Sequence, residues 1–300
     1  MTDGREGERA GVAALDGRTW TARDAPVAHD TAKGAGKVRD VVMLPAFFGP
    51  DERRLFGVGH LPVGGARAAL LMCPPLLHEH MRSYRFFSQM AAQLAGAGIA
   101  CLRFDYYGTG DSGGDDGQFQ PDSTARDLVL AAAELRRLAQ GIPLIVMAAR
   151  ASALFAWRDA GALGASALWL WQPVVDGARY VQSLLARDAR ERGSKHRYPL
   201  LKGRAPALQD DLMGFRLSPG AQQALAALTL AGPGPEVPVS VVDTADGEGH
   251  ALESDARFRL PASLSAWTDE VDLDGLIPLR DARDALEGLL AGLAKGGARG

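Results

Sequence analysis

Cysteine is scarce in this sequence, with two residues among 300. Cys73 ends one predicted strand, and Cys101 lies near the start of another. If these strands are parallel neighbours, an offset of about four residues at ~3.3 Å each keeps the sulfurs too far apart for a disulfide. We therefore expect two reduced thiols. Neither cysteine has the spacing of a zinc site, so we expect no metal, and no cofactor is indicated.

Long apolar runs and an excess of one charge are also missing. No run reaches the roughly 18 residues that a membrane-spanning helix requires. The first residues, 1–9, lack the apolar segment of a secretory signal. Lys and Arg total 33 against 36 Asp and Glu, a net charge of −3, which gives no reason to expect nucleic acid or an anionic membrane as a partner. We expect a cytoplasmic protein.

The residues that are present are sufficient for a large core. Hydrophobic residues make up 47% and charged residues 23%, close to the globular average. Residues 1–42 show no periodicity and predict a loosely attached leader, followed by one domain over 43–300. Within this domain, residues 177–225 are charged, helix-prone and interrupted by Gly, Ser and Pro, which predicts a helical cap.

Predicted strands and helices alternate along the domain. Such alternation indicates βαβ units and a mostly parallel sheet with helices on both faces, an α/β fold. An antiparallel pair at 44–49 and 54–60 comes first. The further strands are expected at 68–73, 99–104, 143–149, 165–171, 237–242 and 262–267, and the helices at 84–94, 123–138 and 280–294.

An arginine occupies the apex of the sharpest predicted turn. Residues 143–157 read as a buried strand, a tight turn and an apolar helix. A nucleophile elbow needs small residues two before and two after its apex, because the backbone folds back on itself there. Ala148 and Ser152 stand at these offsets from Arg150. With Ser152 at the apex, Arg150 and Leu154 would take the cramped positions, so the sequence favours Arg150.

Further motifs carry a family resemblance over residues 47–281. They are Pro-Ala-Phe-Phe-Gly (45–49), Cys-Pro-Pro (73–75), Leu-Arg-Phe-Asp-Tyr-Tyr-Gly-Thr-Gly-Asp-Ser (102–112) and Leu-Trp-Gln-Pro-Val-Val-Asp-Gly (170–177). With them the chain resembles the α/β-hydrolase superfamily, and within its serine-aminopeptidase-like branch the exosortase A system-associated hydrolases of the hydrolase 2 type. In that group the elbow usually reads Gly-x-Arg-x-Gly, and here Ala148 and Ser152 replace both glycines.

The resemblance implies an α/β-hydrolase fold with about eight strands and a cap. It also implies hydrolysis of an ester, thioester or similar acyl substrate and an association with export and surface polysaccharide systems. The motif at 105–112 is expected to be structural, with Asp105 and Ser112 bonding loop amides.

A serine hydrolase needs a nucleophile at the elbow, a histidine after the last strand and an orienting acid. Arg150 occupies the first position, and residues 268–278 contain no histidine. Asp243 stands at the acid position, and His250 lies in the same loop, before the final strand. Two of the three roles are therefore vacant. Ser152 and Cys73 remain weak candidates as nucleophiles, Ser152 as a small turn residue and Cys73 as a buried thiol.

Arg150 has the strongest case for a functional role. A guanidinium at an elbow apex loses solvation and faces an adverse helix dipole, so it requires an acidic partner or an anionic ligand. Glu79 or Asp105 could be that partner, and a bound carboxylate or phosphate could complete the coordination.

The segment 78–83 is the densest polar cluster near the presumed pocket, and it is predicted to be a loop. Glu79 is a candidate for pairing with Arg150. His78, Arg82 and Ser83 are further candidates for ligand contact, although a solvated loop would also explain the histidines. Two functions follow from the sequence: a hydrolase that holds an anionic acyl compound through Arg150, or an inactive pseudo-hydrolase that binds a ligand or a protein.

Overall fold

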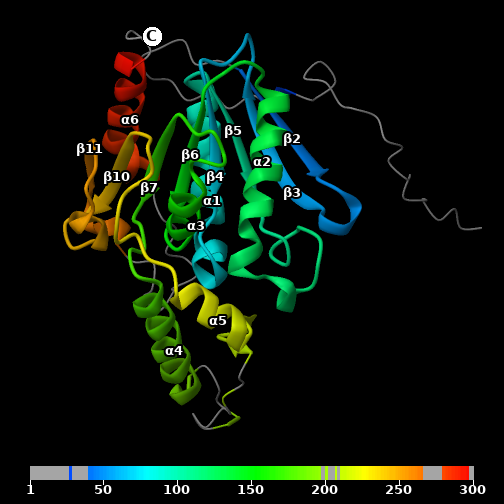
Figure 1. Cartoon of the computed structure of the whole chain (residues 1–300), viewed down its shortest axis with the longest axis vertical. Coiled ribbons are helices and arrows are strands. Elements are labelled where there is room, and N and C mark those ends of the chain that lie inside the picture. Colours follow the sequence, from blue (N-terminus) through cyan, green and yellow to red (C-terminus); the bar gives the residue numbers. More distant parts are fainter. Residues whose placement is uncertain are drawn as a thin grey trace, which may run out of the picture.

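A nine-stranded sheet forms the centre of the protein (Figure 1). The computed structural model describes residues 27–28, 40–196, 200–201, 207, 210–265 and 279–296. The strand order is β1-β2-β3-β5-β4-β6-β7-β10-β11. Their bounds are β1 Val27–Ala28, β2 Val41–Phe48, β3 Leu55–Pro62, β4 Ala68–Cys73, β5 Ile99–Phe104, β6 Leu144–Ala149, β7 Ala167–Trp171, β10 Val239–Thr244 and β11 Ala256–Leu260.

The sheet is antiparallel at one side and parallel over the rest. β2 pairs antiparallel with β1 and β3, and β3 pairs antiparallel with β5. All pairs from β5 to β11 are parallel. Every residue of β4, β5 and β6 is buried, which explains their continuous apolar sequences. The predicted α/β class and mostly parallel sheet are confirmed.

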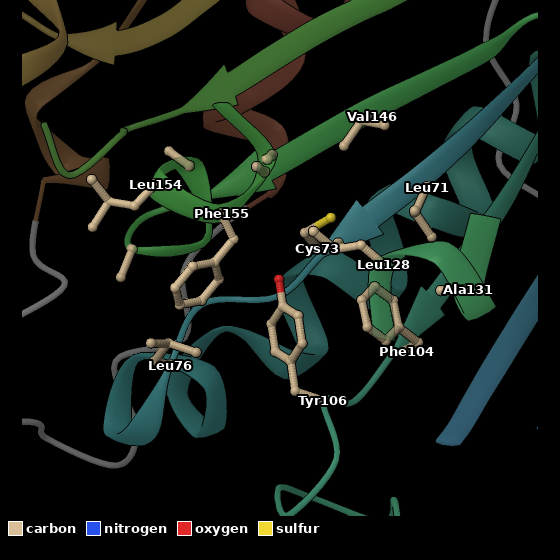
Figure 2. Packing of buried hydrophobic residues seen from close by; sticks show 14 of the residues in the cluster. Leu71, Cys73, Leu76, Phe104, Tyr106, Leu128, Ala131, Val146, Leu154 and Phe155 are labelled. Atoms are coloured by element: carbon tan, nitrogen blue, oxygen red, sulfur yellow. The ribbon is translucent and has the colours of Figure 1, made fainter. Parts of the chain in front are cut away.

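Helices cover both faces of the sheet. Their bounds are α1 Leu77–Gly96, α2 Thr124–Leu138, α3 Ser152–Asp159, α4 Gly177–Gly193, α5 Pro219–Ala226 and α6 Arg283–Gly296. α2 and α3 pack on one face, where Leu71, Val146, Leu128 and Phe155 form part of the core shown in Figure 2. α1 and α6 cover the other face. Side chains alternate along a strand, so residues such as Leu70 point to that side and pack against these helices.

α4 and α5 lie beyond the carboxyl ends of the central strands (Figure 1). They lie at the two ends of the range predicted as a cap, 177–225. The start of α4 lies directly against the end of α5: Gly177 N–H donates to Leu228 O at 2.9 Å. A Cβ on Gly177 would stand 2.0 Å from Leu225 O, so only glycine allows this approach.

Two expectations about secondary structure need correction. α1 begins at Leu77, so residues 78–83 are helical and not a loop. The sequence hid this start because Leu76, the residue before the helix, makes no side-chain cap. The strand expected at 262–267 is wrong: the last strand is β11, and a 3-10 helix follows at Ala262–Leu264.

β11 escaped prediction because it is an edge strand with a mixed sequence. β11 is at the edge of the sheet and has two exposed arginines, Arg257 and Arg259, which lower its apolar content and protect the edge. Two parts of the expected leader belong to the sheet, Val27–Ala28 and the start of β2 at Val41. The rest of that leader, apart from Asp40, lies outside the described residues.

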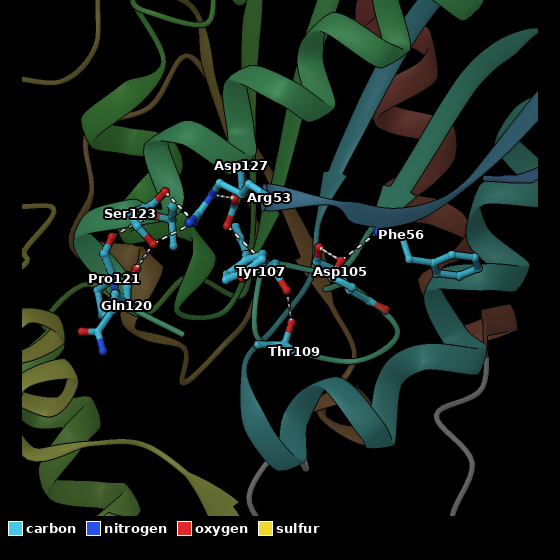
Figure 3. Close-up of polar contacts among 12 residues, drawn as sticks. Arg53, Phe56, Asp105, Tyr107, Thr109, Gln120, Pro121, Ser123 and Asp127 are labelled. Atoms are coloured by element: carbon cyan, nitrogen blue, oxygen red, sulfur yellow. Dashed lines mark hydrogen bonds and ion pairs between the residues drawn. The ribbon is translucent and has the colours of Figure 1, made fainter. Parts of the chain in front are cut away.

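An ion pair joins the turn between β2 and β3 to α2, and the same carboxylate holds the loop after β5 (Figure 3). Arg53 Nε lies 2.6 Å from Asp127 Oδ1, and Tyr107 N–H donates to Asp127 Oδ2 at 3.1 Å. The Arg53 guanidinium also donates to Ser123 Oγ at 2.8 Å and lies over the Tyr107 ring. The Asp127 side chain is 1% exposed, so its charge depends on these partners.

Asp127→Ala is expected to lower the free energy of unfolding by about 3 kcal/mol, because it leaves Arg53 and the Tyr107 amide without an acceptor. Urea denaturation followed by circular dichroism measures this. Glu134→Ala in the same helix is the matched control, since its partner Arg137 is half exposed and such pairs contribute about 0.5 kcal/mol. Equal losses in the two variants would contradict the prediction.

Candidate functional site

Three backbone irregularities gather at one edge of the sheet. Leu77 follows β4 with φ +53°, Arg150 follows β6 with φ +54° and Gln172 follows β7 with φ +44°. A residue with a side chain rarely adopts this left-handed conformation. Such strain persists only where the surroundings impose it, and it concentrates at functional sites. The carboxyl edge of β4, β6 and β7 is therefore the candidate site.

Arg150, not Ser152, takes the left-handed conformation at the elbow. Its N–H donates to Trp171 O at 3.0 Å, and its carbonyl accepts from Ala153 N–H at 3.0 Å as α3 begins. Ala148 and Ser152 are fully buried on either side. The turn is this tight because small residues stand at both flanking positions.

The acidic partner of Arg150 is Glu79. Nε of Arg150 donates to Glu79 Oε1 at 3.1 Å, Nη2 lies 3.1 Å from the same oxygen, and Nη1 donates to Gln172 O at 2.9 Å. Glu79 is fully buried, and its Oε2 accepts from Tyr180 Oη at 3.1 Å. Burial alone would lower the pKa of Arg150, but the Glu79 carboxylate raises it above its usual value. The guanidinium is permanently charged.

Tyr180 joins α4 to this network, and no sequence motif predicts it. It is 101 residues from Glu79, in a segment without a family motif. Asp105, the other expected partner of Arg150, instead lies 3.3 Å from His80 Nε2 and accepts from Asp111 N–H. Ser112 Oγ donates to Asp105 O and accepts from Phe56 N–H. Together with the bond from Asp111 N–H, these contacts fit the expected structural role of the loop.

The other residues of α1 that were expected to contact a ligand, His78, Arg82 and Ser83, differ in their surroundings. His78 is 8% exposed, and both of its ring nitrogens lack a hydrogen-bond partner among the described residues. Burial lowers its pKa to about 3, helped by the positive charges of Arg187, Arg82 and Arg150. Arg82 is half-buried. Ser83 Oγ donates to Glu79 O at 2.7 Å, within the helix.

The two weak nucleophile candidates are engaged in the core. Ser152 Oγ donates to Pro74 O and accepts from Tyr106 Oη at 3.0 Å. Cys73 is 1% exposed beside Tyr106 and Phe155 (Figure 2), and burial raises its pKa. The structure shows both cysteines as free thiols. A protonated, buried thiol is a poor nucleophile.

The expected acid and histidine do not form a pair. Asp243 is 3% exposed and accepts from Thr244 N–H at 2.7 Å and Gly249 N–H at 2.8 Å. Burial raises its pKa, although these amides and His250 act in the opposite direction. His250 is exposed, and its Nε2 lies 2.7 Å from Thr244 O. Residues 266–278 lie outside the described residues, but residues 268–278 contain no histidine.

No Ser-His-Asp arrangement is therefore present in the described part of the chain. The same residues contain no group of three His, Cys, Asp or Glu placed to hold a metal ion. None of the described helices combines the length and apolarity that a membrane crossing requires. What the site contains is a charged guanidinium at the elbow, held between α1, β7 and α4.

No known family model and no curated protein matches the chain in sequence. In structure it is similar to a hypothetical protein from Pseudomonas aeruginosa, with a TM-score of 0.55, 16% identity, and coverage of 84% of this chain and 94% of that one. The α/β-hydrolase GrgF from Penicillium sp. sh18 also has a TM-score of 0.55, with 17% identity over 84% of this chain and 98% of GrgF. The chain has the α/β-hydrolase fold.

A further structure with this fold is a soluble variant of monoglyceride lipase from Saccharomyces cerevisiae, in complex with a substrate analogue. It has a TM-score of 0.51 and 14% identity, and the similarity covers 88% of this chain and 98% of the lipase. At these identities the similarity establishes the fold alone. Any activity of this α/β-hydrolase-fold chain has to be argued from its own site.

Arg150→Met is expected to lower the free energy of unfolding by about 3 kcal/mol, because it leaves the Glu79 carboxylate buried without a cation. Adding Glu79→Gln to this variant should restore roughly 1–2 kcal/mol by removing the orphaned charge. Urea denaturation of the wild type, both single variants and the double variant measures the coupling. Losses that simply add would show that the pair is not coupled.

Proposed function

We propose that this chain binds an acyl-type compound through an anionic group at Arg150 and does not hydrolyse it by a serine mechanism. The observation that carries the proposal is a guanidinium at the apex of the nucleophile elbow, with 18% of its side chain exposed. In this fold ligands bind at the carboxyl edge of the sheet. A planar guanidinium there suits carboxylate or phosphate groups.

The electrostatic surroundings support an anionic ligand. His78 is flanked by three arginines whose positive charges help to lower its pKa, and two of them, Arg150 and Arg187, are paired with Glu79 and Glu191. At neutral pH its imidazole is uncharged, and one ring nitrogen can donate while the other accepts. Such a buried side chain, without a hydrogen-bond partner among the described residues, favours contact with a polar ligand or water.

Glu79 limits how strongly an anion is held. It neutralises Arg150, so an entering carboxylate meets an ion pair and not an isolated cation. A role for Glu79 as a general base is disfavoured, because one oxygen accepts from Arg150 and the other from Tyr180 in a fully buried position. Its inferred role is to hold the guanidinium in place.

Of the two functions expected from the sequence, the geometry favours the ligand-binding pseudo-hydrolase. Hydrolysis of an ester or thioester would need Cys73 or Ser152 to leave the contacts described above, or Glu79 to activate water. Acyl transfer at this site would meet the same obstacle. The exosortase association and a cytoplasmic location stay predictions from the sequence.

A binding experiment tests the proposal with butanoate and its neutral isostere butanamide. Butanoate is expected to bind, and Arg150→Met should weaken it at least about tenfold through loss of a charge-assisted hydrogen bond. Glu79→Gln should strengthen it by about tenfold, because the competing carboxylate is removed. Isothermal titration calorimetry measures these changes. Equal affinity for butanamide, or unchanged binding in Arg150→Met, would contradict anion recognition.

An activity experiment separates the two functions. A panel of p-nitrophenyl acyl esters should be hydrolysed no faster than in buffer, and a fluorophosphonate probe should label no serine. The double variant Cys73→Ala/Glu79→Gln is the matched control. Activity lost in that variant would identify a hydrolase with an unconventional mechanism, and a labelled serine would refute the account of the elbow.

A further inference from the structure

Arg103 is a buried cation without a carboxylate partner in the described part of the chain. It lies on β5, on the face of the sheet that α1 covers, and is 9% exposed. A buried charge is costly unless it is paired, because the protein interior replaces the solvation that water provides. The neighbours of Arg103 are therefore informative.

Both side-chain partners of Arg103 are neutral. Nε donates to His60 Nε2 at 3.4 Å, and the guanidinium lies 4.7 Å from the centre of the Tyr84 ring. Burial, followed by the charge of Arg103, lowers the pKa of His60 to about 4, so the imidazole is uncharged at neutral pH. The tyrosine ring provides a cation–π contact but no counter-charge.

Arg103 lines a small cavity between α1 and the sheet. Its volume is about 20 Å³, and its walls include the apolar side chains of Met72, Phe87 and Met147 together with Tyr84. A single water molecule needs a cavity of roughly 10–15 Å³. The cavity therefore admits a ligand of about the size of a single large ion.

The one acid in the cavity is already engaged. Asp105 shares the wall with His80, whose Nε2 lies 3.3 Å from Asp105 Oδ1. The other oxygen, Oδ2, accepts from Asp111 N–H at 3.0 Å. The Asp105 charge is thus directed to groups other than Arg103.

We propose that this cavity binds a small monovalent anion of about the size of chloride, held by the Arg103 guanidinium. The anion supplies the counter-charge that His60 and Tyr84 lack. Because Arg103 lies between β3 and α1, the bound anion stabilises the packing of α1 on the sheet. The site is separate from Arg150 and stands whether or not that residue binds an acyl compound.

Thermal unfolding of the full chain tests this proposal at constant ionic strength, with sodium chloride or sodium bromide replaced by sodium gluconate. Gluconate is too large for the cavity. Chloride and bromide should raise Tm by about 2 °C over gluconate, because an anion that binds only the folded state stabilises it. Arg103→Met should abolish this difference, and Arg137→Met, at a half-exposed surface arginine, should preserve it.

Equal Tm values of the wild type in the three salts, or a chloride effect that persists in Arg103→Met, would overturn the proposal. Should Arg103→Met fail to fold, wild-type crystals soaked in sodium bromide decide the question. An anomalous peak beside the Arg103 guanidinium supports the site, and its absence refutes it. Titration with butanoate distinguishes the two proposals, since its binding should be lost in Arg150→Met and not in Arg103→Met.

Discussion

The ion pair between Arg150 and Glu79 is the interaction on which the candidate site depends. It connects the elbow after β6 to the first turn of α1, and the Tyr180 hydroxyl extends it to α4. Each group is tolerable in the interior only because the others are present: the guanidinium needs the carboxylate, and the carboxylate needs two donors. The pair therefore fixes how α1, the elbow and the cap helices meet at one edge of the sheet.

This arrangement changes what an α/β-hydrolase elbow can do. The strained turn that normally exposes a hydroxyl is preserved here, with φ +54° at its apex, but it presents a cation that cannot lose its proton. Ser152 lies two residues after the apex and is hydrogen-bonded to Pro74 O, and Cys73, the last residue of β4, is buried in the core. The scaffold keeps its geometry, and under the proposed function its elbow attracts negative charge instead of attacking a carbonyl.

Sequence patterns predicted the parts of this structure that burial dictates. The apolar runs of the central strands are visible because both faces are covered, and the elbow is visible because the turn tolerates only small neighbours. The start of α1 at Leu77 escaped because no side chain caps it, and β11 escaped because arginines interrupt its pattern. Tyr180 and the His80–Asp105 contact join distant segments, and no local spacing encodes such meetings.

Gln172 links the elbow to the side of the sheet that ends at β11. Its carbonyl accepts from Arg150, its N–H donates to Val242 O, and its side-chain amide donates to Leu264 O. One residue thus ties the apex to β10 and to the turn after β11. A substitution near Leu264 would therefore disturb the support of the Gln172 carbonyl that accepts from the guanidinium.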